Sequence, residues 1–164
     1  MLANYPIRQE SALTTEPPFD LAAAHRYFSA ECFNTAWDLM EKSDRTAEED
    51  LLMVALSQAS IYHWSQRPDC TQENLSIGFW QASRIQALLG NASEARRHAE
   101  TCLRFSHQLA PFYVGYAYEA LARAERLAGE QARYEDYLAV ARDWAAKVTD
   151  EEDRSLLMQD LDTL

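Results

Sequence analysis

Apolar residues recur at steps of three and four along almost the whole chain, the spacing that places side chains on one face of an α-helix. Three such series run Leu21, His25, Phe28, Cys32, Ala36 and Leu39; Leu52, Ala55, Leu56, Ala59, Tyr62 and His63; and Tyr134, Tyr137, Leu138, Ala141, Trp144 and Ala145. No strong series shows the two-residue alternation of a strand. Only four glycines and five prolines occur among 164 residues. The pattern predicts an all-α fold.

Capping residues and helix breakers divide the chain into seven predicted helices. Thr46 and Glu49 fit a capping box at the start of the second helix, and Pro111 suits the first turn of the fifth. Gly90 and Gly129 are placed to end the third and fifth helices. Further caps are predicted at Asp69 with Gln72, Asn91 with Glu94, and Thr149 with Glu152.

The N-terminal residues differ from the rest because they contain three prolines and show no helical period. We therefore expect an extended arm over residues 1–18 and a single helical-repeat domain over residues 19–164. Within the domain the pattern predicts a divergent hairpin at 19–67, two repeat units at 72–147 and a capping helix at 150–164.

The formal net charge of −11 would repel a phosphate backbone, so nucleic acid is not an expected partner. No apolar run is long enough to cross a bilayer, and the first residues lack the basic and apolar regions of a secretory signal. These features predict a cytoplasmic protein without a membrane partner.

Residues that carry chemistry are present but are not grouped in sequence. Cys32, Cys70 and Cys102 are far apart, and no two histidines have the spacing that places two metal ligands on one helix. No phosphate-binding loop or nucleophile elbow is present. We expect no catalytic residue, metal or cofactor, although a site assembled from scattered residues such as His25 and His63 stays open.

A repeat emerges when Gly90 is aligned with Gly129, an offset of 39 residues. At this offset Arg84 matches Arg123, and aromatic residues match as well, Phe79 with Tyr118 and Phe105 with Trp144. A hairpin of two helices leaves one apolar face open, and stacking of neighbouring hairpins covers it.

The first unit resembles the tetratricopeptide repeat, with Gly90 at the turn and Ala95, Ala99 and Cys102 at the family's packing positions in the second helix. The second unit departs from the family, because Tyr134 replaces a small residue and the period is longer. Residues 62–124 also resemble a group of uncharacterised bacterial helical-repeat proteins. The resemblance implies a right-handed α–α superhelix of about three hairpins with a C-terminal capping helix.

In tetratricopeptide repeats the first helix of each hairpin builds a concave wall that binds peptides. Transfer of those positions to this chain selects Trp80, Arg84, Tyr116, Glu119, Arg123 and Arg126. The resemblance thus implies a non-catalytic protein- or peptide-binding scaffold, and the arginines favour an acidic partner, because a guanidinium can bind a carboxylate through two hydrogen bonds. A simpler interpretation is that Glu119 pairs with Arg123 one helical turn away.

Two other functions remain open. A small-molecule sensor or enzyme would use a pocket around His63, Trp64, Trp80 and Glu119. A structural homo-oligomer would cover the apolar edges that the end helices of a short stack leave exposed.

Overall fold

The computed structural model describes residues 17–164, so residues 1–16 of the predicted arm lie outside the described residues. Within this range the chain forms seven α-helices and no strand, which confirms the all-α prediction. They are α1 (Leu21–Glu41), α2 (Ala47–Ser65), α3 (Gln72–Leu88), α4 (Ala92–Ser106), α5 (Pro111–Ala128), α6 (Gln131–Ala145) and α7 (Glu151–Asp162).

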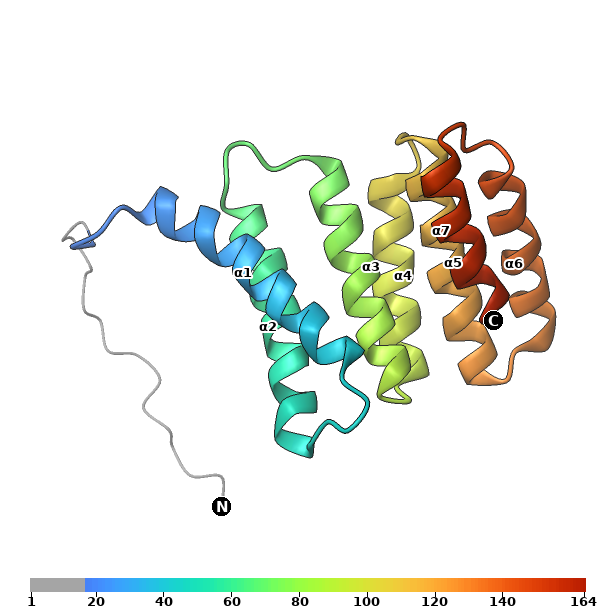
Figure 1. The fold of residues 1–164 in the computed structure, drawn as a ribbon, viewed down its shortest axis with the longest axis horizontal. Helices are drawn as coiled ribbons and strands as arrows, with labels where there is room; N and C mark the ends of the chain where they lie inside the picture. The colour runs from blue at the N-terminus through green and yellow to red at the C-terminus, as the bar shows by residue number, and fades with distance from the viewer. Residues whose placement is uncertain (1–16) are drawn as a thin grey trace, which may run out of the picture.

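Consecutive helices pack side by side in pairs, α1 with α2, α3 with α4 and α5 with α6 (Figure 1). The pairs are stacked in chain order, so that α1 and α2 lie at one end of the molecule and α7 lies against α5 and α6 at the other. Helix α3 also packs against α5 of the next pair. No helix of residues 17–164 is both long enough and apolar enough to cross a membrane.

Four of the predicted helix boundaries are confirmed. The Thr46 hydroxyl accepts the N–H of Glu49 while the Glu49 carboxylate accepts the N–H of Thr46, a complete capping box. Pro111 is the first residue of α5. Gly90 and Gly129 adopt φ of 79° and 76°, the left-handed conformation that turns the chain after a helix and favours glycine.

The predicted cap of α3 is wrong by two residues. Thr71 caps this helix, and its side chain and that of Asn74 form the reciprocal hydrogen bonds of a capping box. Asp69 instead accepts two hydrogen bonds from Arg67, at 2.9 and 2.8 Å, which hold the pKa of this carboxyl down at about 2. Because the Asp69 carboxylate pairs with Arg67, it does not cap the start of α3.

The caps predicted for α4 and α7 also differ from the structure. Asn91 occupies the capping position of α4, but its side chain donates to Gln86 and does not accept from the first turn. Helix α7 is capped by Asp150 and not by Thr149, because the Asp150 carboxylate accepts two N–H groups of the first turn at 3.0 Å.

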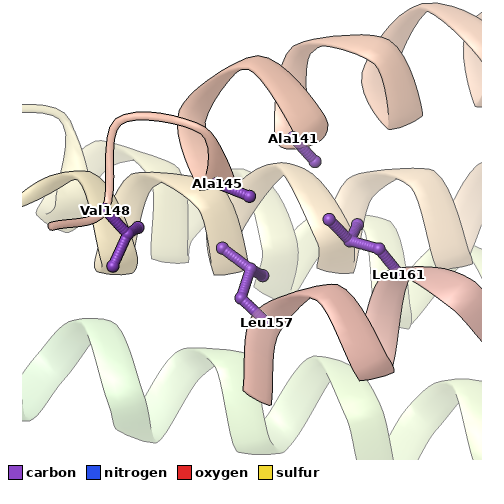
Figure 2. Close-up of a cluster of buried hydrophobic side chains, with 5 residues drawn as sticks. All are labelled: Ala141, Ala145, Val148, Leu157 and Leu161. Carbon is purple, nitrogen blue, oxygen red and sulfur yellow. The ribbon is translucent and has the colours of Figure 1, made fainter. Parts of the chain in front are cut away.

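A buried apolar cluster fixes α7 to the preceding pair (Figure 2). It consists of Ala141, Ala145, Val148, Leu157 and Leu161. The two leucines of α7 point toward the alanines of α6, whose small side chains allow the helices to approach closely. Gly115 of α5 serves the same purpose, because a Cβ atom there would lie only 2.5 Å from Leu157 Cδ2. A larger residue at position 115 would therefore displace the Leu157 side chain from its present position.

Candidate functional site

An apolar cavity of about 330 Å³ lies where the four odd-numbered helices meet, and we call it the aromatic cavity. Five aromatic side chains line it, namely Trp37 of α1, Trp80 of α3, and Phe112, Tyr113 and Tyr116 of α5. Ile77 and Leu156 add partly exposed aliphatic surface, and Ser76 and Asp160 complete the lining.

The rings of the cavity form a continuous series of contacts across three helices. Trp37 stacks on Trp80 with ring centroids 5.7 Å apart and planes inclined by 28°. Trp80 meets Tyr116 edge to face at 5.3 Å, and Tyr116 meets Phe112 in the same way at 4.9 Å. Both arrangements are the geometries that aromatic pairs prefer. The rings thus connect the first, second and third helix pairs.

A buried carboxylate fixes one of these rings. Glu119 of α5 is fully buried, and its Oε2 accepts a hydrogen bond from Trp80 Nε1 at 3.0 Å. Its Oε1 binds Arg84 Nη1 of α3 at 3.1 Å and Arg123 Nε at 2.7 Å. Three donors therefore satisfy the charge of Glu119, as a buried carboxylate requires.

The C-terminal helix joins this network through Asp160. The Asp160 carboxylate lies 3.4 Å from Arg84 Nη2 and accepts a hydrogen bond from the Tyr116 hydroxyl at 3.1 Å. Burial and then the neighbouring Asp160 charge raise the pKa of Tyr116 well above its usual range, so the phenol stays protonated and donates. Helix α7 thus contributes Leu156 and Asp160 to the wall of the cavity.

Arg123 and Arg126 of α5 contact Thr163, the residue that follows α7. Arg123 Nη2 donates to the Thr163 hydroxyl, and Arg126 Nη1 donates to the Thr163 carbonyl, both at 3.1 Å. A second hollow of about 380 Å³ lies among these arginines, Arg84 and Leu164.

The six residues selected from the repeat fall into three groups in the structure. Trp80 and Tyr116 line the aromatic cavity, Arg84, Arg123 and Arg126 line the second hollow, and Glu119 is buried and binds Trp80, Arg84 and Arg123. The structure shows that Arg84 and Arg123, matched by the repeat, bind the same carboxylate. Sequence reasoning missed Trp37, Phe112 and Tyr113. For Tyr113 the available signal was an offset of 36 residues, which matches Trp80 with Tyr116 and Ile77 with Tyr113.

His63 and Trp64 lie apart from Trp80 and Glu119. His63 Nδ1 is 2.8 Å from His25 Nδ1 near the start of α1, and Trp64 is covered by the guanidinium of Arg67 at 3.8 Å. Trp80 contacts α1 at Trp37, twelve residues beyond His25, which corresponds to roughly 18 Å along a helix. These four residues do not share one pocket.

The remaining reactive groups do not add a second site. Cys102 is fully buried, and burial raises the pKa of its thiol to about 11. Among residues 17–164, no three His, Cys, Asp or Glu side chains are arranged to hold a metal ion. The odd-numbered helices therefore offer apolar surface, aromatic faces and carboxylates.

Comparisons of this chain with protein-family models, with curated proteins and with solved structures found no match.

Proposed function

We propose that the protein is a non-catalytic binding module that holds a segment of a partner protein against the aromatic cavity. The observation that carries the proposal is the cavity itself, whose aromatic lining is open enough for a side chain to enter. Trp and Tyr dominate the binding energy of protein interfaces because they bury a large area at a low entropic cost. A cavity of about 330 Å³ is within the size range of ligand sites.

The proposal agrees with the resemblance to tetratricopeptide repeats. The first helices of successive hairpins correspond to α1, α3 and α5, and α7 follows as the capping helix. The aromatic cavity lies on these helices, on the side that forms the concave peptide-binding wall in that family. We propose that the pairs continue as the right-handed superhelix that the resemblance implies.

The fixed positions of two rings of the aromatic cavity also support binding there. Trp80 is held by Glu119 at 3.0 Å, and Tyr116 is held by Asp160 at 3.1 Å. Rings that are already fixed lose little conformational freedom when a partner docks on them.

The expectation of an acidic partner required arginines that are not already paired with carboxylates of the protein itself. Arg84 and Arg123 both bind Glu119, and Arg84 also pairs with Asp160, so these two guanidinium groups already face two carboxylates. A partner acidic enough to compete would have to use the arginine-lined hollow beside Arg126. The apolar cavity is the better supported part of the surface.

Peptide selection tests this function. Peptides displayed on phage would be selected against the full-length protein, and the affinities of the selected peptides would be measured by calorimetry. Ile77→Gln and Leu156→Gln, which change partly exposed residues of the cavity, should each weaken binding roughly five- to tenfold.

Leu51→Gln is the matched control, since Leu51 is 74% exposed on α2 and does not line the cavity. Selected peptides that bind both cavity variants as tightly as the unmodified protein would refute the proposed site.

Self-association is a second candidate function, favoured by the apolar surface of the first helix pair. Large exposed apolar residues gather there, namely Phe19, Leu21, Tyr27, Phe28, Leu51, Leu52 and Tyr62. Terminal units of a helical stack need a polar outer face to remain single in solution. Sedimentation velocity should then show a dimer that Leu51→Gln weakens, whereas a monomer at all concentrations would exclude this candidate.

A further inference from the structure

Several acidic side chains lie in or near the lining of the aromatic cavity. Asp160 of α7 lines it directly, and Glu41 of α1 accepts a hydrogen bond from Trp37 Nε1 at 2.8 Å. Glu73 of α3 and Asp153 of α7 are near enough to Tyr113 to add to the rise of its pKa that burial causes. Carboxylates from three helices therefore approach the cavity.

The positive charge nearby does not balance them. Arg84 and Arg123 compensate Glu119 and Asp160, two guanidinium groups for two carboxylates. Within residues 17–164, Glu41, Glu73 and Asp153 have no Lys, Arg or His partner within ion-pair distance. The residues near the cavity therefore carry an excess of negative charge, on a protein whose formal net charge is −11.

We propose, on the basis of the proposed function, that the docked segment is positively charged and inserts an arginine or lysine side chain into the aromatic cavity. The faces of Trp37 and Trp80 attract a cation through their π-electrons, and an arginine guanidinium also stacks on such rings. The aliphatic stem of the side chain contacts Ile77 and Leu156. The carboxylates near the cavity attract the charged segment from solution.

Three blocked pentapeptides with alanine on both sides of the central residue test this inference, the central residue being arginine, norleucine or glutamate. Binding to the full-length ¹⁵N-labelled protein would be followed by the indole N–H signals of its four tryptophans. The arginine peptide should shift the signals of Trp37 and Trp80 and leave those of Trp64 and Trp144 in place. It should bind about two- to fivefold tighter than the norleucine peptide at low salt, the advantage expected of a cation–π contact.

Charge variants separate attraction by charge from simple apolar contact. Glu73→Gln and Asp153→Asn should each weaken the arginine peptide and leave the norleucine peptide unchanged. Glu48→Gln, at an exposed acidic residue of α2, is the control and should change the binding of neither peptide. Added salt should reduce the preference for the arginine peptide over the norleucine peptide, because it screens the carboxylates near the cavity.

Each outcome has a distinct meaning. Equal binding of the arginine and norleucine peptides overturns the charge inference and leaves the binding function standing. Preference for the glutamate peptide overturns the charge inference in favour of an acidic partner. No shift of Trp37 or Trp80 with any peptide at millimolar concentration overturns both the inference and the proposed site.

Discussion

Trp80 donates its indole N–H to the fully buried carboxylate of Glu119 across 3.0 Å, and the two residues are 39 positions apart, the length of the predicted repeat. The same carboxylate forms ion pairs with Arg84 and Arg123. One acidic residue thus both orients a ring of the aromatic cavity and joins α3 to α5.

Loss of either arginine should destabilise the protein, because Glu119 would keep its charge in a buried place with less compensation. We expect Arg123→Ala to lower the free energy of unfolding by about 2 to 4 kcal/mol in urea titrations. Arg97→Ala is the control, since the exposed Arg97–Glu94 pair should contribute less than about 1 kcal/mol. Equal losses in the two variants would mean that the Glu119 network does not stabilise the fold.

Gly115 and Gly78 differ in how much space a Cβ atom would have at each position. A Cβ atom at position 115 would meet Leu157 Cδ2 at 2.5 Å, whereas one at position 78 would meet Ile61 Cγ1 at 3.1 Å. Gly115→Ala should therefore cost about 1 to 3 kcal/mol of stability through overpacking, even though alanine favours a helix. Gly78→Ala should be close to neutral. Thermal unfolding of both variants measures the difference, and a stabilising Gly115→Ala would contradict the observed docking of α7.

Acidification should destabilise the first helix pair. Burial and the neighbouring His25 lower the pKa of His63, and the hydrogen bond between their Nδ1 atoms requires one of them to lack a proton. The unfolded chain then binds more protons than the folded one, so stability present above about pH 6.5 is lost as the pH falls below it.

Urea titrations at pH 7.5, 6.5 and 5.5 would measure this loss. His63→Gln should make stability less dependent on pH, although burial also lowers the pKa of His98 and will keep part of the dependence. An identical pH dependence in the unmodified protein and His63→Gln would contradict the assignment.

Cysteine reactivity should follow burial. Cys70 is partly exposed, whereas Cys32 and Cys102 are buried. A thiol reagent added to the folded protein should therefore modify Cys70 first, and Cys102, with its pKa near 11, only after unfolding. Mass spectrometry of the digested protein would identify the order, and early labelling of Cys102 would show that α3 and α4 separate readily.

The sequence predicted those features that depend on neighbouring residues. The capping box of Thr46 and Glu49 is contained in four consecutive positions, and Gly90 and Gly129 supply a backbone conformation that other residues avoid. The apolar period likewise identified the helices. These signals are local, so no tertiary contact was needed to find them.

The buried face of α2 shows where the apolar pattern fails. Leu52, Ala55 and Tyr62 were predicted to face the core but are exposed, whereas Ser57 and Ser60 are buried. Their hydroxyls donate to backbone carbonyls, and that of Ser60 reaches across to Ser29 of α1. A small side chain with a satisfied hydroxyl packs well between helices, which a hydrophobicity pattern does not register.

The aromatic cavity could be predicted only in part for a related reason. Trp80 and Tyr116 were both selected from the wall positions of tetratricopeptide repeats, but Trp37 belongs to the divergent first pair. Its contact with Trp80 depends on how α1 lies relative to α3, a tertiary relationship that the spacing of residues does not contain. The partners of Arg84 were hidden for the same reason, since Asp160 lies 76 residues further along the chain.

The order of the cavity's walls along the chain has a consequence for biosynthesis. Trp37, Trp80 and Tyr116 leave the ribosome early, but the wall that includes Asp160 is made only when α7 has emerged and docked beside Gly115. A nascent chain that ends before α7 carries an open, apolar aromatic surface without its acidic lining. The lining of the aromatic cavity is therefore complete only after α7 has docked, and until then the rings of Trp37, Trp80 and Tyr116 are available to chaperones.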